Sequence, residues 1–222
     1  MFAIALDGPA GAGKSTVAKM VAERMGMHYV DTGAMYRTLA YVILQKKVDI
    51  KDEAAVSAGV KDIDVRVRYE DNLQKMYVGE TDVTPYIRTP EVGEVSSAIA
   101  VYGGVRGKLL NMQRGLAEEY EVIMDGRDIG TAILPNAPLK IYLTADAEER
   151  GKRRFLELEA KNPGTHDLEE IIQGIKDRDY RDSHREIAPL CQAEDAIVVD
   201  TTHMSAEEAA DKIIQLAMEV KG

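Results

Sequence analysis

Short apolar runs alternate with longer amphipathic segments along most of the chain. Apolar, β-rich runs lie at residues 2–6, 27–30, 122–124, 139–145 and 196–200. Helical patterns are clearest at 14–25, 33–46, 90–119, 146–161, 167–185 and 205–219, and Gly103-Gly104 interrupts the third of them. The last pattern opens on Ser205 with Glu208 three residues on, which is a capping-box sequence. Strands that alternate with helices in this way predict an α/β fold with a parallel sheet between helices.

Residues 62–88 depart from this rhythm. Apolar and polar residues alternate there around two pairs of turn-forming residues, Asp71-Asn72 and Gly79-Glu80. Alternation with a period of two and such turns predicts a small antiparallel sheet with one solvated face. The segment is too short to bury a core of its own, so we interpret it as an insertion.

The length and charge of the chain narrow its organisation and its partners. A chain of 222 residues has room for one large α/β domain with a small insertion, and we expect no second full-sized domain. The formal net charge of −10 disfavours non-specific attraction to nucleic acid or to an anionic membrane. We therefore expect neither partner, and an anionic ligand must be met by locally clustered lysines and arginines.

Cysteine content and the apolar runs indicate the compartment. The single cysteine, Cys191, leaves no intramolecular disulfide and fits a reducing environment. The first residues lack the basic start and long apolar core of a signal peptide, and no stretch approaches about 18 apolar residues. The four histidines are scattered, without the spacing of metal ligands. We expect a soluble, cytoplasmic protein without a protein-built transition-metal site.

The sequence DGPAGAGKST follows the first β-rich run and precedes a helical pattern. Gly8, Gly13, Lys14 and Ser15 fit the spacing G-x-x-x-x-G-K-[ST]. Glycines let the N–H groups of such a loop converge on phosphate oxygens, and the helix N-terminus adds its positive dipole end. Lys14 would reach the β and γ phosphates, and the Ser15 hydroxyl would bind Mg²⁺. The motif predicts a nucleoside triphosphate site made of Gly8, Pro9, Ala10, Gly11, Ala12, Gly13, Lys14, Ser15 and Thr16.

Such a loop is shared by nucleotide switches, motors and kinases. The chain lacks an N-K-x-D guanine motif and a D-x-x-G after the third β-rich run, and its length leaves little room for the coupling domains of a motor. A small kinase remains, and it needs a second anion site. Ligands of open parallel sheets bind at the strand ends, where two motifs supply Asp31, Thr32 and Arg37, and Asp125, Arg127 and Asp128. A helix cap with an ion pair is the alternative interpretation of each motif.

The stretch RDYRDSHR, residues 178–185, is dense in charge and has two interpretations. On a helix, Arg178, Asp182 and Arg185 fall at i, i+4 and i+7, with Arg181 on the same face. This geometry fits a surface ladder of ion pairs as well as an anion site. In a chain with a phosphate-binding loop we favour the anion site, with Asp182 holding its flanking arginines, while Arg181 stays ambiguous.

Residues 150–166 are the candidate for a mobile lid. Arg150, Arg153 and Arg154 share one helix face, and the turn at 162–164 would let the segment move. A solvated cationic helix that pairs with Glu148 and Glu149 is the alternative.

Taken together, the motifs resemble those of the bacterial cytidylate kinase family: DGPAGAGKST, DTGAMYR, SSAIA…VR, DGRDIGT…PNAPLKIYLTA, RDYRDSHREIAPL and EDAIVVDTT. The resemblance runs in order from residue 3 to the C-terminal helix and includes the insertion. It implies the nucleoside monophosphate kinase fold, with a five-stranded parallel sheet, a mobile acceptor-binding region and a lid, as a single kinase domain over residues 1–222. It further implies Mg²⁺-dependent transfer of the ATP γ-phosphoryl group to CMP or dCMP, and we expect a monomer.

The same resemblance implies the acceptor-binding residues. It assigns Arg37 and Arg127 to the acceptor phosphate, Thr32, Arg106, Asp128 and Arg185 to cytosine, and Ser97, Arg178 and Asp182 to the sugar. Ser97 and Arg106 rest on the resemblance alone. The chemistry agrees, because the cytosine amino group requires acceptors while N3 and O2 require guanidinium donors. Uracil reverses this polarity, and each buried mismatch costs about 1–3 kcal/mol, so we expect CMP to be preferred over UMP.

Transfer to a phosphate needs no strong general base, because the acceptor is already an ionised nucleophile. In-line positioning and charge neutralisation would supply most of the catalysis. We assign these roles to Lys14, Mg²⁺ on Ser15, Arg127 and a lid arginine, Arg150. Two alternatives stay open: a kinase for UMP, dTMP or a non-nucleotide, and a regulatory module that binds ATP without transferring it.

Overall fold

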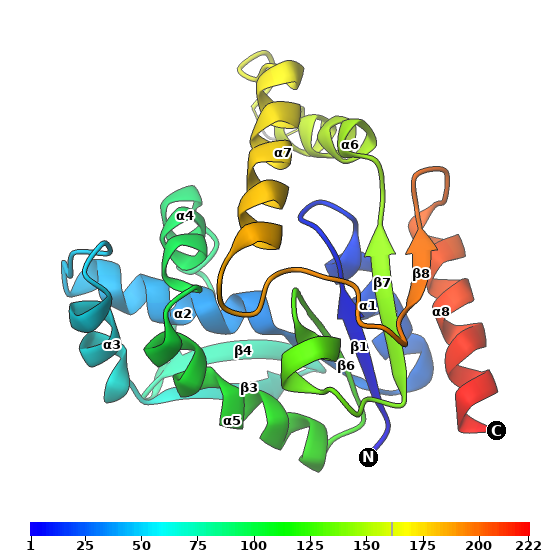
Figure 1. Ribbon diagram of the computed structural model, residues 1–222, viewed down its shortest axis with the longest axis horizontal. Helices are drawn as coiled ribbons and strands as arrows, with labels where there is room; N and C mark the ends of the chain where they lie inside the picture. Colours follow the sequence, from blue (N-terminus) through cyan, green and yellow to red (C-terminus); the bar gives the residue numbers. More distant parts are fainter. Residues whose placement is uncertain (161) are drawn as a thin grey trace. The chain divides into compact units, whose positions relative to one another are not determined.

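The computed structural model describes residues 1–160 and 162–222 (Figure 1). The chain forms two compact units, one of Met1 with His28–Val122 and one of Phe2–Met27 with Ile123–Gly222. Among the described residues, no helix is long and apolar enough to cross a membrane.

The main sheet has five strands in the order β2-β6-β1-β7-β8. Strand β1 pairs in parallel with β7, with Ile4 opposite Leu139, and β7 pairs in parallel with β8, with Ile141 opposite Ile197. Every residue of β1 is buried, as expected for an inner strand of a parallel sheet covered on both faces. The predicted α/β fold with a five-stranded parallel sheet is confirmed, since all predicted runs form strands: β1 (Ala3–Asp7), β2 (His28–Asp31), β6 (Val122–Gly126), β7 (Leu139–Thr144) and β8 (Ile197–Asp200).

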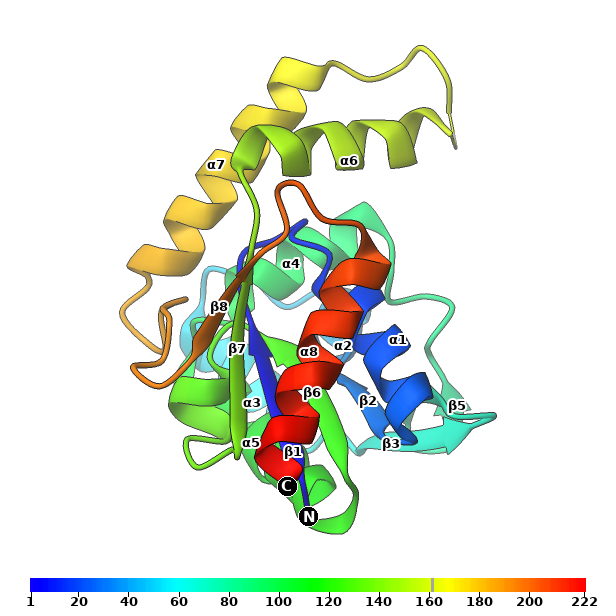
Figure 2. The same ribbon diagram turned by 90° about the vertical axis from the view of Figure 1, so that its right-hand side faces the viewer.

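Four α-helices and a π-helix belong to the unit that contains β1 and β7. Helix α1 (Lys14–Met25) packs against α8 (Ala206–Lys221), which lies along β7 (Figure 2). The predicted capping box of α8 is present, with reciprocal hydrogen bonds between Ser205 and Glu208. Helices α6 (Ala147–Glu159) and α7 (Leu168–His184) pack on each other. The π-helix η1 (Ile129–Ile133), which follows β6, was not predicted.

The other unit carries the predicted antiparallel sheet. Its strands are β3 (Val65–Glu70), β4 (Leu73–Val78) and β5 (Thr81–Asp82), in the order β3-β4-β5. Asp71 and Asn72 connect the first two strands with φ of 50° and 60°, as a two-residue hairpin turn of this handedness requires. The alternating pattern and its turn residues therefore predicted this sheet correctly.

Helices α2 (Thr32–Gln45), α3 (Glu53–Lys61), α4 (Pro90–Ile99) and α5 (Gly103–Glu119) complete this unit. The predicted interruption of the pattern at 90–119 is a break between α4 and α5, where the Tyr102 hydroxyl donates a hydrogen bond to the Ile50 carbonyl at 2.9 Å. Helix α3 was not predicted. Its N-terminal signal is Asp52, whose side chain accepts a hydrogen bond from the Ala55 N–H.

Candidate functional site

The loop between β1 and α1 closes around the side chain of Lys14. The Lys14 Nζ donates hydrogen bonds to the carbonyl oxygens of Gly8 and Pro9, both at 2.8 Å. A Cβ on Gly8 would lie 1.9 Å from the Leu143 carbonyl oxygen on β7, and Gly13 has φ of 89°, so both positions require glycine. Burial and the nearby Arg127 lower the Lys14 pKa to about 7. The loop thus has the conformation and the cation that phosphate binding requires.

Ser15 and Asp125 place two oxygen ligands beside this loop. The exposed Ser15 hydroxyl donates a hydrogen bond of 2.7 Å to Oδ2 of Asp125, a buried residue on β6. A hydroxyl and a carboxylate suit Mg²⁺, which usually takes few protein ligands and completes its shell with water and substrate phosphates. Within residues 1–160 and 162–222, no group of three or more His, Cys, Asp or Glu side chains could hold a metal ion. The donor set therefore fits Mg²⁺ that is bound together with a nucleotide.

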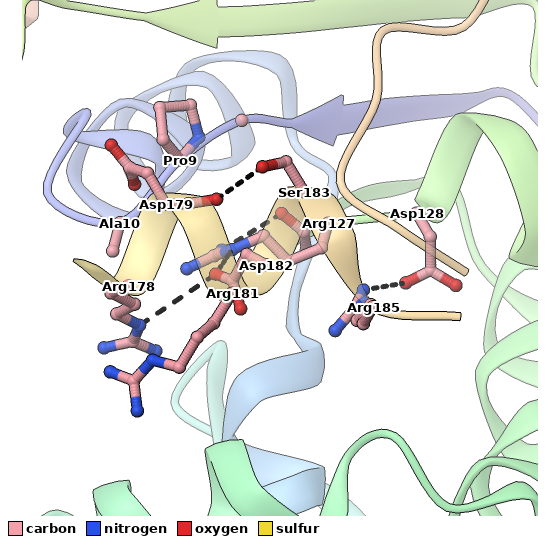
Figure 3. Close-up of polar contacts among 12 residues, drawn as sticks. Pro9, Ala10, Arg127, Asp128, Arg178, Asp179, Arg181, Asp182, Ser183 and Arg185 are labelled. Carbon is pink, nitrogen blue, oxygen red and sulfur yellow. Dashed lines mark hydrogen bonds and ion pairs between the residues drawn. The ribbon is translucent and has the colours of Figure 1, made fainter. Parts of the chain in front are cut away.

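Asp182 on α7 holds the guanidinium of Arg127, which follows β6 (Figure 3). Arg127 Nε donates a hydrogen bond of 2.9 Å to Asp182 Oδ2, and Arg178 Nε lies 4.0 Å from the same oxygen. Burial by itself would raise the pKa of Asp182, but Arg127 and the other arginines hold it below its ordinary value. Arg185 turns toward Asp128, with Nη2 3.7 Å from Oδ1. The arrangement brings Arg127, Asp128, Arg178, Asp182 and Arg185 together in one unit.

The predicted helical position of Arg185 is wrong. Helix α7 ends at His184, and Arg185 is extended with ψ of 144°. The chain turns back at Ala188, which has φ of 48°. In this turn the Arg185 Nε donates a hydrogen bond to the Ala188 carbonyl at 2.5 Å, and the Leu190 N–H donates one to the backbone carbonyl of Asp182. Arg185 reaches Asp128 from a turn rather than from a helix face. Asp182 pairs with its flanking Arg178 at 4.0 Å, as predicted, and also accepts a hydrogen bond from the distant Arg127.

Arg150 on α6 connects three segments of the same unit. Its Nε donates to the Ala145 carbonyl at 2.8 Å, its Nη1 to the Ala10 carbonyl at 2.9 Å, and its Nη2 to Asp179 Oδ2 at 2.6 Å. The Arg150 side chain is buried. It therefore joins the phosphate-binding loop to α7, and its contact with a transferring phosphoryl group stays a prediction.

The other two lid arginines have different surroundings. Arg153 Nη2 donates to the Thr201 carbonyl at 2.6 Å, while Arg154 is half exposed and pairs with Glu157 at 3.0 Å. Arg153 Nε also lies 3.5 Å from a carboxylate oxygen of Glu149. This ion pair agrees with the alternative interpretation of the segment as a solvated cationic helix that pairs with Glu148 and Glu149. The proposed lid at about 150–166 includes residue 161, which lies outside the described residues, and its motion stays a prediction.

Asp31 organises the start of α2 in the other unit. Its Oδ2 accepts a hydrogen bond of 2.7 Å from Arg88 Nη2, and its Oδ1 caps the helix. A Cβ on Gly33 would lie 2.9 Å from Arg37 Nη1 and 3.1 Å from Asp31 Oδ1, so the Arg37 guanidinium lies over the first turn. Asp31 thus pairs with Arg88, an arginine that the sequence motifs did not single out, while the predicted Arg37 lies over the first turn of the helix that Asp31 caps.

Three further predicted residues lie in this unit. Thr32 is buried at the first position of α2, Ser97 is half-buried on α4, and Arg106 is half-buried in the first turn of α5. Their roles stay predictions.

The sequence model of the cytidylate kinase family matches residues 4–219. The chain is 49% identical over 215 residues to a cytidylate kinase of Bacillus licheniformis, an alignment that covers 96% of this chain and 94% of that protein. It is 46% identical over 217 residues to a cytidylate kinase of Lactobacillus johnsonii, with 97% and 94% covered. The chain belongs to the cytidylate kinase family. The resemblance stated from its motifs is confirmed.

A solved structure shows the same fold at low identity. An uncharacterized protein from Eubacterium ventriosum matches this member of the cytidylate kinase family with a TM-score of 0.53 and 15% identity, over 98% of this chain and 99% of that one. At this identity the likeness concerns the fold alone.

Two acidic residues of this cytidylate kinase family member escaped the sequence analysis. Asp7 ends the buried strand β1 directly before Gly8, and its carboxylate accepts hydrogen bonds from the N–H groups of Ile129 and Gly130. Asp179 follows Arg178 in the charged motif and binds Arg150. An ionisable residue at the end of a fully buried strand was a usable signal for Asp7. Asp179 had no local signal, because its partner lies on another helix.

Proposed function

We propose that the chain transfers the γ-phosphoryl group of ATP to CMP or dCMP, giving ADP and CDP or dCDP. The observation that carries this proposal is the proximity of two cationic groups with different supports. Lys14 is held by the phosphate-binding loop, and Arg127 is held by Asp182. Arg127 is close enough to lower the pKa of Lys14. Two anions brought to these groups would meet at one place, as transfer between phosphates requires.

The donor nucleotide binds at the loop of residues 8–16. The backbone N–H groups of the loop and Lys14 hold the phosphates of ATP. Arg150 supports the loop through a hydrogen bond to the Ala10 carbonyl. Ser15 and Asp125 would hold Mg²⁺, which neutralises charge on the β and γ phosphates when it is bound with the nucleotide.

For the acceptor, the assignment of binding residues follows the family resemblance. Arg37 and Arg127 hold its phosphate, and Ser97, Arg178 and Asp182 hold its sugar. Thr32, Arg106, Asp128 and Arg185 contact the cytosine. The pairing of Asp128 with Arg185 supports this assignment, because an acceptor and a donor side by side match the adjacent amino group and N3 of cytosine.

Catalysis consists of positioning and charge neutralisation by Lys14, Arg127 and a lid arginine, for which Arg150 is the candidate. The chain acts as a single kinase domain over residues 1–222, with 62–88 an insertion of the acceptor-binding region and about 150–166 the lid. It acts as a cytoplasmic monomer that binds no nucleic acid or membrane, which the net charge of −10 supports.

Phosphorylation of a panel of monophosphates tests this function. The purified protein is mixed with ATP, Mg²⁺ and CMP, dCMP, UMP, dTMP or AMP, and initial rates of ADP formation are measured. We expect the highest kcat/KM for CMP and dCMP, with UMP lower by at least about tenfold because of mismatched hydrogen bonds.

A Lys14→Ala variant purified in the same way controls for contaminating kinases and should show no transfer. A better acceptor than CMP and dCMP would contradict the specificity. Stoichiometric ATP binding without ADP formation in the presence of CMP would instead indicate a regulatory ATP-binding module.

A further inference from the structure

Asp7 caps the π-helix η1 from a different strand. Its side chain is buried, and the residue is only 4% exposed. Oδ1 accepts a hydrogen bond from the Ile129 N–H at 2.8 Å, and Oδ2 accepts one from the Gly130 N–H at 2.7 Å. Because both oxygens of one carboxylate engage consecutive N–H groups, the carboxylate fixes the position and the orientation of the first turn of η1.

This cap replaces the one that Asp128 would ordinarily provide. Asp128 occupies the N-cap position of η1, where an aspartate usually accepts a hydrogen bond from an N–H of the first turn. The Asp128 side chain makes no such bond here. Its carboxylate instead faces Arg185, with Oδ1 3.7 Å from Nη2. Asp7 therefore satisfies the helix start while the carboxylate of Asp128 is directed elsewhere.

The surroundings of Asp7 are built for this contact. A Cβ on Gly130 would lie 3.4 Å from Asp7 Oδ2 and 3.2 Å from Lys140 Cδ, so the start of η1 lies directly against both side chains. Burial raises the pKa of Asp7 to about 6, with the two N–H groups and Lys14 opposing and Asp128 adding to the rise. The two hydrogen bonds from N–H groups favour the ionised carboxylate, which accepts at both oxygens.

We infer that Asp7 is a positioning residue for base specificity: by capping η1 in place of Asp128, it leaves the Asp128 carboxylate directed toward Arg185, the pair assigned to the acceptor base. The inference rests on the proposed function, in which Asp128 contacts the cytosine amino group. Asp7 itself touches neither substrate in this account and acts through Asp128.

Replacement of Asp7 by asparagine tests this positioning role. An amide accepts with one oxygen only, and its NH₂ group would oppose the second N–H of η1. Asp128 would then turn to cap the helix. We expect the ratio of kcat/KM for CMP over UMP to fall about tenfold in Asp7→Asn, which corresponds to one mispaired buried hydrogen bond. The KM for ATP should change less than about threefold, whereas a general folding defect would leave the CMP to UMP ratio intact.

A double-mutant cycle shows whether Asp7 acts through Asp128. Asp128→Asn alone should lower the same ratio, and the Asp7→Asn, Asp128→Asn double variant should lower it no further than Asp128→Asn does. Asp195→Asn is the matched control, since it removes a carboxylate that binds Lys140 at 2.8 Å in the same unit. Its ratio should equal that of the unaltered protein.

The outcomes distinguish the proposed role of Asp128 from the inferred role of Asp7. If CMP is not phosphorylated, or if Asp128→Asn leaves the ratio unchanged, the proposed role of Asp128 fails and the inference fails with it. If Asp128→Asn lowers the ratio and a folded Asp7→Asn does not, the inference alone is overturned. If Asp7→Asn does not fold, Asp7→Glu gives the second test, because its extra methylene displaces the carboxylate from the N–H groups of Ile129 and Gly130 while keeping the charge, and an unchanged ratio in this variant also overturns the inference.

Discussion

At the scale of single residues, a buried carboxylate, Asp182, holds the guanidinium of Arg127, which we propose binds the acceptor phosphate. Asp182 lies in a mostly buried position, where an unpaired charge would be destabilising. The hydrogen bond to Arg127 compensates for this burial and fixes the guanidinium before any ligand binds. Pre-organisation of this kind lowers the entropic cost of holding an acceptor phosphate.

The ion pair predicts a pH dependence of stability. The folded-state pKa of Asp182 lies below its ordinary value of 3.8. The stabilisation is therefore complete above the unfolded-state pKa, and it is lost as the pH falls through the folded-state pKa. We expect Asp182→Asn to be less stable at pH 7 by about 1.5–3 kcal/mol, and to lose less stability than the unaltered protein between pH 6 and the acid range.

Urea unfolding followed by circular dichroism at several pH values measures this difference. Asp200→Asn is a comparison, because the pKa of that exposed carboxylate is also lowered, but by hydrogen bonds from the neutral Thr202; it should change the pH dependence in the same direction and by less than Asp182→Asn. Parallel stability curves for the unaltered protein and Asp182→Asn would show that the ion pair contributes no pH dependence.

At the scale of elements, the packing of α6 on α7 depends on a glycine. A Cβ on Gly151 would lie 2.3 Å from Ile172 Cγ1, closer than any real contact. A Cβ built on Gly174 of α7 would have no neighbouring atom within 4 Å. The two glycines thus differ in packing while both lie inside helices.

Alanine at these two positions should have opposite effects. Gly174→Ala should stabilise the protein by about 0.5–1 kcal/mol, because alanine has the higher helix propensity. Gly151→Ala should destabilise it by about 1–3 kcal/mol, because Ile172 must move. Hydrogen exchange of the α6 and α7 amides, together with the melting temperature, measures both effects. Equal stabilisation by the two variants would mean that the helices are not packed as described.

At the scale of the whole molecule, an acidic chain carries a site for anions. The net charge of −10 would repel nucleotides at long range, so the proposed nucleotide binding depends on local cations, for which Lys14 and Arg127 are the candidates. Both are held in place by hydrogen bonds within one unit.

Binding at such a site should stabilise the folded chain. At an ATP and Mg²⁺ concentration about 100 times the dissociation constant, linkage contributes about 2.7 kcal/mol. For a chain of this size we expect the melting temperature to rise by about 5–10 °C. Thermal melts with and without ATP and Mg²⁺ measure the shift, and removal of Mg²⁺ by a chelator should reduce it. Lys14→Ala should lose most of the shift, and a full shift in this variant would place the nucleotide elsewhere.

Patterns that are local in the sequence predicted much of the molecule. Hydrophobic periodicity gave the strands and most helices, and Asp71-Asn72 marked the hairpin, because both depend on neighbouring residues. The pattern did not predict α3, which is short, or η1, whose hydrogen bonding departs from the usual helical period. The spacing of Gly8, Gly13, Lys14 and Ser15 was informative for the same reason, since the loop binds with its own backbone.

What the sequence determined by itself was the α/β fold, the phosphate-binding loop and membership of a kinase family. Only the tertiary structure decided how the charged residues pair. Asp182 holds Arg127 across 55 positions of sequence, and Asp7 caps η1 across 122 positions. The charged motif at 178–185 predicted the pairing of Asp182 with its neighbour Arg178 but not its shorter hydrogen bond with Arg127. The physical reason is that a carboxylate binds the donors that the folded chain brings to it, and the parallel sheet brings together strand ends that lie far apart in sequence.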